Sequence, residues 1–163
     1  MMLHEETRKK ISAKWLEKAT KDLAVGKLLF KKGKIYFDFT CFHCQQCAEK
    51  AVKGFLVWHD TPFRKIHDLV SLGSLCLPID SSLEETLKST ALLSRYAVDA
   101  RYPGEDGEEH TKNQTMEALE LAGLVLAEIL KRLPFETHPT SSAKTIKNGK
   151  PGKKNPARKK RKT

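Results

Sequence analysis

The 163-residue sequence lacks any apolar run long enough to cross a membrane, and its first residues lack the apolar segment of a secretory signal. Cysteine is also scarce, because four residues are far too few for a secreted scaffold held together by disulfides. Strand patterns are missing as well, since no stretch alternates apolar and β-branched residues with polar ones. These absences predict a cytoplasmic protein with reduced thiols, no membrane partner and no β-rich fold.

Acidic residues are absent from residues 138–163, which contain ten Lys and Arg residues. The formal net charge of +10 therefore lies in this segment, and residues 1–137 are formally neutral. The segment also has no aromatic residue and no hydrophobic periodicity, so it cannot bury enough apolar surface to offset the entropy of ordering. We expect one folded domain over 1–137 and a disordered Lys/Arg-rich tail over 138–163.

Hydrophobic periodicity predicts four long helices and a short one. Apolar residues recur every three or four positions over about 6–32, 36–58, 67–75, 83–101 and 111–133. Two overlapping pairs, Ser81 with Glu84 and Ser82 with Glu85, have the spacing of a capping box at the start of a helix. Thr111 and Gln114 repeat this spacing before the last helix. The sequence thus predicts an all-α, up-and-down bundle of four to five helices.

Three cysteines, Cys41, Cys44 and Cys47, share one face of the helix predicted over 36–58. A metal site would add His43 or Cys76 to them. Structural metal sites usually place paired cysteines in turns, however, and no second pair is present. Buried cysteine otherwise packs as a small hydrophobic residue. We therefore predict core packing, with no metal site and no cofactor.

Polar residues on the same predicted helix have two interpretations. One side of the helix holds Gln46, Lys50 and Lys53, and an overlapping side holds Gln45, Glu49 and again Lys53. They form either a solvated face with an ion pair at i,i+4 spacing, or a groove of hydrogen-bonding groups that faces a neighbouring helix.

Two further polar motifs lie at helix ends. His67 and Asp68 precede the short helix, where Asp68 suits a helix N-terminus whether or not it contacts a ligand. Arg101 and Tyr102 stand before Pro103, where the preceding long helix is expected to stop. Arg101 suits bidentate phosphate contact and Tyr102 suits stacking on a base. Equally, Arg101 could donate to the last carbonyls of the helix, and Tyr102 could cover the edge of the core.

The motifs follow one another as Gln45-Gln46-x-Ala48-Glu49-Lys50-Ala51-x-Lys53, then His67-Asp68-Leu69, then Arg101-Tyr102-Pro103. This ordered set resembles the HEPN domain family (higher eukaryotes and prokaryotes nucleotide-binding domain) over roughly residues 10–133. The resemblance implies a helical bundle that commonly forms a homodimer and that binds a nucleotide or partners a small nucleotidyltransferase, in some cases within a toxin–antitoxin pair. The corresponding nucleotide-binding candidates are Gln46, Lys50, Lys53, His67, Arg101 and Tyr102.

Other members of that family are metal-independent ribonucleases with an R-x(4–6)-H motif near the start of the last helix. There the His would act as acid and base on the ribose 2′-hydroxyl, while the Arg would stabilise charge on the phosphate. In this sequence Arg101 and His110 are separated by eight residues, four of them acidic, so the motif is not matched. An endoribonuclease that uses Arg101 and His110 is therefore the second hypothesis.

The basic tail allows a third hypothesis, in which the bundle is a dimer scaffold without catalytic activity and the tail binds nucleic acid. Its cationic block consists of Arg158, Lys159, Lys160, Arg161 and Lys162. Such a block suits contact with nucleic-acid phosphates, but it also suits a tail whose only effect is to raise solubility.

Overall fold

The computed structural model describes residues 4–63, 65–99 and 110–139, and within these ranges the chain forms helices and no strand. The α-helices are α1 (Glu5–Lys32), α2 (Phe37–Trp58), α3 (Leu69–Cys76), α4 (Glu84–Lys88), α5 (Thr90–Asp99) and α6 (Lys112–Lys131). Short 3-10 turns are η1 (Lys34–Tyr36), η2 (Ser81–Leu83) and η3 (Phe135–Thr137). The all-α prediction is confirmed.

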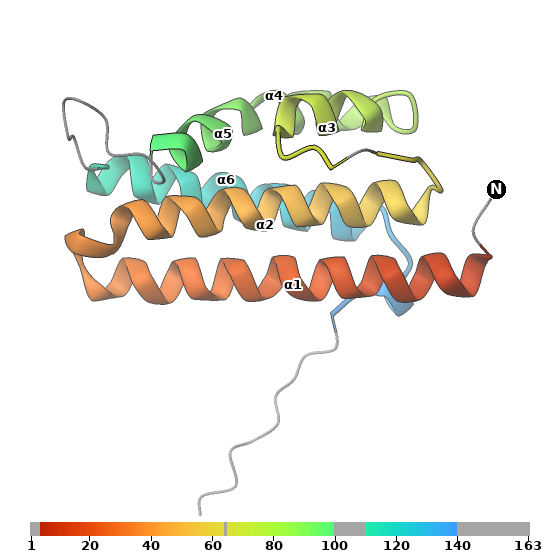
Figure 1. Ribbon diagram of the computed structural model, residues 1–163, viewed down its shortest axis with the longest axis horizontal. Coiled ribbons are helices and arrows are strands. Elements are labelled where there is room, and N and C mark those ends of the chain that lie inside the picture. Colours follow the sequence, from red (N-terminus) through yellow and green to blue (C-terminus); the bar gives the residue numbers. More distant parts are fainter. Residues whose placement is uncertain (1–3, 64, 100–109, 140–163) are drawn as a thin grey trace, which may run out of the picture.

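The helices run up and down, as Figure 1 shows. The long helices α1 and α2 form an antiparallel hairpin, and α6 runs beside α2 in the same direction as α2. The shorter helices α4 and α5 return in the opposite direction, and of these α5 packs on α2 beside α3, while α4 packs against α3, α5 and α6. Because α2 packs against α1, α3, α5 and α6, nearly its whole surface is covered.

The α1–α2 hairpin depends on a close approach of the two backbones. Gly33 ends α1 with a φ of 109°, a conformation that residues with a side chain rarely adopt. Farther along the hairpin, a Cβ atom placed on Gly54 would lie 3.2 Å from two side-chain atoms of Leu16. At the same level Ser12 Oγ donates a hydrogen bond of 2.9 Å to the Gly54 carbonyl oxygen. A side chain at position 54 would therefore crowd Leu16, which would have to shift by a few tenths of an ångström.

The cysteines pack in the core, as predicted. Cys41, Cys44, Cys47 and Cys76 are free thiols, and each is fully buried. They belong to one apolar cluster with residues from every long helix, including Leu16, Phe55, Leu72, Leu93 and Ile129.

The helix predicted over 83–101 differs from the structure in two ways. It is interrupted at Ser89, where the Ser89 and Thr90 hydroxyls donate hydrogen bonds of 2.7 and 2.6 Å to carbonyls three residues earlier. Such bonds compete with regular helix geometry. The capping boxes predicted for Ser81 and Ser82 are also wrong, because Asp80 caps the turn by accepting from the backbone N–H of Ser82 at 2.9 Å.

The cap predicted for the last helix is confirmed. The backbone N–H of Gln114 donates to Thr111 Oγ1, and the Thr111 N–H donates to Gln114 Oε1 at 2.8 Å. Of the helices described, none has the length and apolar character that a membrane span requires.

Candidate functional site

The carboxylate of Glu49 is the centre of a buried polar cluster on α2. Only 4% of the Glu49 side chain is exposed. Its oxygens lie 2.9 Å from Gln45 Nε2, 2.8 Å from Lys53 Nζ and 3.0 Å from His67 Nδ1. We call these four residues, Gln45, Glu49, Lys53 and His67, the Glu49 cluster. His67 comes from the connection between α2 and α3, so this connection covers the polar side of α2.

The Glu49 cluster favours a negative charge on Glu49. Burial of the carboxyl raises its pKa, but the hydrogen bonds from Lys53, Gln45 and His67 outweigh that effect and hold the pKa below its ordinary value. Glu49 is therefore an ionised carboxylate inside the fold, and it accepts hydrogen bonds without donating any.

Lys53 is enclosed on its other sides by aromatic rings. Its ammonium lies 5.6 Å from the centroid of the Trp15 ring and 5.8 Å from that of Phe63, and its side chain is only 6% exposed. The ion pair at i,i+4 spacing thus forms, but it is buried rather than solvated. Because Glu49 already balances the charge of Lys53, this lysine is not presented to a ligand at the surface.

Gln46 extends the Glu49 cluster toward the surface. Its Nε2 donates to Gln45 Oε1 at 2.8 Å, and Gln45 in turn donates to the backbone carbonyl of His67 at 3.3 Å. Three of the predicted site residues, Gln46, Lys53 and His67, are therefore joined in one hydrogen-bond network.

Lys50 belongs to a different network, which the sequence did not predict. Its ammonium is paired with the carboxylate of Asp22 on α1, and His43 Nδ1 lies 2.9 Å from the same carboxylate. All three side chains are partly buried between α1 and α2. An acid on one helix facing a lysine on the next leaves no local spacing signal, so only the packed hairpin shows the pair.

The first turn of α3 anchors the chain just after His67. Asp68 caps the helix by accepting from the backbone N–H of Ser71 at 2.8 Å, and hydrogen bonds from Ser71 hold its pKa below the ordinary value. The N–H of Leu69 lies 3.3 Å from Ser94 Oγ on α5. The capping interpretation of Asp68 is therefore confirmed, and α3 is tied to α5 beside the Glu49 cluster.

Two of the candidate nucleotide-binding residues, Arg101 and Tyr102, lie outside the described residues, as does the tail block Arg158, Lys159, Lys160, Arg161 and Lys162. Ser94, which contacts the start of α3, precedes Arg101 by seven positions along the chain.

His110, the histidine of the ribonuclease hypothesis, has a buried side chain. Its Nδ1 lies 2.6 Å from Asp38 Oδ1, and its backbone N–H donates to the same oxygen at 3.1 Å. The ring of Tyr96 packs edge-on against it, with centroids 4.9 Å apart. Only 5% of the His110 side chain is exposed. This imidazole joins the start of α6 to α2 and α5, and an RNA backbone could not reach it without local rearrangement.

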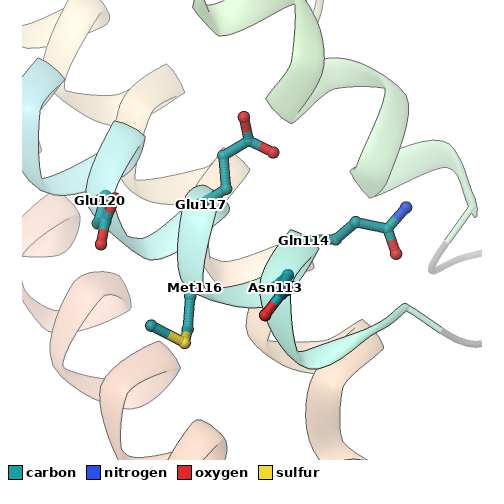
Figure 2. Close-up of a pocket in the computed structure, with 5 residues that line it drawn as sticks. All are labelled: Asn113, Gln114, Met116, Glu117 and Glu120. Atoms are coloured by element: carbon teal, nitrogen blue, oxygen red, sulfur yellow. The ribbon is translucent and has the colours of Figure 1, made fainter.

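A separate open pocket lies along α6, lined by Asn113, Gln114, Met116, Glu117 and Glu120. Figure 2 shows that all five side chains come from this one helix. Two of them are carboxylates, which repel phosphate. Glu117 also accepts a hydrogen bond of 3.3 Å from Tyr96. The pocket contains none of the predicted nucleotide-binding residues, so the Glu49 cluster remains the candidate site. In the part of the chain that the structure describes, no group of three or more His, Cys, Asp and Glu side chains could hold a metal ion.

Comparison with known proteins places the chain beside a family of helical domains. The model of the HEPN domain matches residues 12–133. A protein of Methanocaldococcus jannaschii named "Putative toxin MJ1304" is 32% identical over an alignment of 132 residues, and the match covers 72% of this chain and 84% of that protein. Crystal structures of TT1696 from Thermus thermophilus and of ST0689, an archaeal HEPN homologue, are also similar. The first has a TM-score of 0.64 at 28% identity, covering 75% of this chain and 98% of TT1696. The second has a TM-score of 0.58 at 25% identity, covering 74% of this chain and 96% of ST0689.

Proposed function

The chain belongs to the HEPN domain family, and we propose that it is the nucleotide-binding component of a toxin–antitoxin pair whose other component is a small nucleotidyltransferase. The observation that carries this proposal is the Glu49 cluster, in which a buried carboxylate holds an exposed imidazole in a fixed place on the bundle. Fixed polar groups at a surface suit ligand recognition, because little side-chain entropy is lost on binding.

The proposal gives the candidate residues different roles. His67 and Gln46 contact the nucleotide directly, while Lys53 acts from inside the fold by keeping Glu49 ionised. Lys50 is less buried than Lys53, and its ammonium would reach a phosphate by exchanging its Asp22 partner for the ligand. Arg101 contacts the phosphates and Tyr102 stacks on the base, in keeping with the chemistry of guanidinium and phenol groups.

The toxin–antitoxin role is supported by the similarity to the Methanocaldococcus jannaschii protein, whose name is "Putative toxin MJ1304". HEPN domains are commonly dimeric, and we propose a homodimer here as well.

Calorimetric titration of the full chain with ATP, GTP and a short RNA tests the nucleotide-binding role. We expect saturable binding of at least one of them, weakened about 10-fold or more by Arg101→Ala because a charge-assisted phosphate contact is lost. The matched control is Arg95→Ala, an exposed arginine on the preceding helix α5, which should bind as the unmodified chain does. Circular dichroism establishes that both variants keep the helical fold.

Two outcomes would contradict the proposal. The first is no saturable binding to any of the three ligands, and the second is equal weakening in both variants. The ribonuclease hypothesis is tested on a denaturing gel, by incubating the RNA with the full chain and with His110→Ala in the presence of EDTA. RNA cleavage by the full chain that disappears in His110→Ala would support the hypothesis. It would also mean that the buried imidazole becomes accessible to RNA.

A further inference from the structure

His67 is the most exposed of the described histidines that pair with a carboxylate, and its carboxylate partner is the most buried. The His67 side chain is 68% exposed, whereas the Glu49 side chain that it contacts is 4% exposed. The contact is made through Nδ1. Since the two ring nitrogens lie on different sides of the imidazole, Nε2 is the nitrogen left for contact with a molecule outside the fold.

The chemistry of Glu49 determines which of these nitrogens carries the hydrogen. The ionised carboxylate can only accept a hydrogen bond, so His67 Nδ1 must donate. In the neutral imidazole the other nitrogen, Nε2, then has a free lone pair and acts as an acceptor. The carboxylate thus fixes a tautomer that presents an acceptor, rather than a donor, to a ligand.

Several contacts hold this arrangement in place. Lys53 and Gln45 donate to the Glu49 carboxylate and fix its orientation. Gln45 also donates to the backbone carbonyl of His67. The next residue, Asp68, caps α3. Both the ring and the backbone of His67 are therefore anchored, and neither anchor depends on a ligand.

We propose that His67 Nε2 accepts a hydrogen bond from the ribose 2′-hydroxyl of the bound nucleotide, with Glu49 as the positioning residue, so that the site selects ribonucleotides over deoxyribonucleotides. This inference rests on the proposed nucleotide-binding function and names its ligand class. An acceptor does not suit phosphate, whose oxygens are themselves acceptors at neutral pH. Donors on the base edges vary from base to base, whereas every ribonucleotide carries the 2′-hydroxyl, which is the group that distinguishes RNA from DNA.

The direct test compares the affinities of the full chain for ATP and for 2′-deoxyATP, and for a short RNA and the DNA of the same sequence. Loss of one neutral hydrogen bond is expected to weaken the deoxy ligand about 3- to 10-fold. His67→Ala should bind both members of each pair equally. Since His67 is exposed, this variant should fold normally. Lys65→Ala, an exposed neighbour in the same connection, is the control and should keep the discrimination.

The positioning role of Glu49 has its own readout. Long-range nitrogen–proton NMR spectra of the ligand-free full chain, recorded where the imidazole is neutral, should show hydrogen on Nδ1 of His67. Glu49→Gln should raise the fraction with hydrogen on Nε2 and reduce the preference for ribose, although Glu49 touches no ligand. If Glu49→Gln does not fold, the tautomer in the unmodified chain and the His67→Ala titrations still decide the proposal.

The outcomes distinguish failure of the ribose contact from failure of the proposed nucleotide-binding function. Equal affinity for ribose and deoxyribose ligands, with nucleotide binding retained, would overturn the ribose contact and leave the proposed function standing. Hydrogen on Nε2 of His67 in the unmodified chain would overturn the positioning role of Glu49. Binding of neither member of either pair would overturn the proposed function, and the ribose contact with it.

Discussion

Removing the charge of Glu49 is expected to cost more stability than removing the charge of Lys53. Glu49→Gln leaves the Lys53 ammonium, whose side chain is 6% exposed, facing two aromatic rings without a carboxylate. Breaking a buried ion pair in this way costs about 3–5 kcal/mol. Lys53→Met leaves the Glu49 carboxylate with its contacts to Gln45 and His67. Hydrogen bonds to a charged group contribute about 1.5–3 kcal/mol each, so we expect the smaller loss of about 2–3 kcal/mol.

Urea unfolding of the full chain, followed by circular dichroism at one protein concentration, measures these differences. For a chain of this size, about 2–4 °C in Tm accompanies each kcal/mol, so Glu49→Gln should lower Tm by about 10 °C. The double variant Glu49→Gln with Lys53→Met removes both charges. It should lose clearly less than the sum of the two single variants, because neither buried charge is then left without its partner.

The exposed pair Glu17–Lys21 provides a control with the same i,i+4 spacing. Lys21→Met should leave the urea midpoint unchanged within error, because surface ion pairs contribute little. The reasoning would be refuted if Lys53→Met cost more than Glu49→Gln, or if the two losses were additive in the double variant. Either result would mean that the charge of Glu49 is stabilised by something other than the contacts described above.

Three further predictions follow from burial and packing. The pKa of Glu49 in the folded protein lies below its ordinary value of 4.5. The ionised Glu49 carboxylate therefore contributes its full stabilisation above about pH 4.5, and this stabilisation is lost as the pH falls through the lower folded-state pKa. Glu49→Gln should accordingly flatten the acid side of a plot of unfolding free energy against pH. Burial raises the pKa of Cys41 to about 11 and that of Cys76 to about 12, so a thiol reagent at neutral pH should leave the native protein largely unmodified and react fully in denaturant. Gly54→Ala should destabilise the protein by about 1–3 kcal/mol in urea unfolding, because the added Cβ would crowd Leu16. The control Gly123→Ala should stabilise the protein by up to about 1 kcal/mol, because nothing lies within 4 Å of the added Cβ. Equal effects of the two variants would contradict the close approach of α1 and α2.

The helices could be predicted well where periodicity and capping chemistry agree. The pattern over 6–32 corresponds to α1, the pattern over 36–58 corresponds to α2, and Thr111 with Gln114 marks the start of α6. Prediction failed near Ser89, because its hydroxyl and that of Thr90 bond to backbone carbonyls in a way that periodicity does not register. It also failed at Asp80, which competes with the two following serines for the same capping position.

The candidate site was harder to predict than the helices, since its properties depend on which surfaces are covered. Spacing alone placed Glu49 and Lys53 close enough to pair, but it could not show that the pair is buried. Burial comes from the non-periodic connection between α2 and α3, which brings Phe63 and His67 over the helix. The partner of Lys50 was missed for a similar reason, because Asp22 lies 28 positions earlier on another helix.

His110 and His67 both contact a carboxylate through Nδ1, but the imidazole is buried in the first pair and exposed in the second. This difference determines which imidazole is accessible to a ligand. His110 has a side chain that is 5% exposed and pairs with an Asp38 side chain that is 36% exposed. His67 is 68% exposed and pairs with a Glu49 side chain that is 4% exposed. In the first pair the imidazole is the inner group, so it holds helices together. In the second pair the carboxylate is the inner group, so the imidazole is oriented from within and its other nitrogen remains accessible. A ligand that needs an oriented imidazole therefore has one at His67 without any change in the fold, whereas at His110 it would first have to separate α6 from Asp38 and Tyr96.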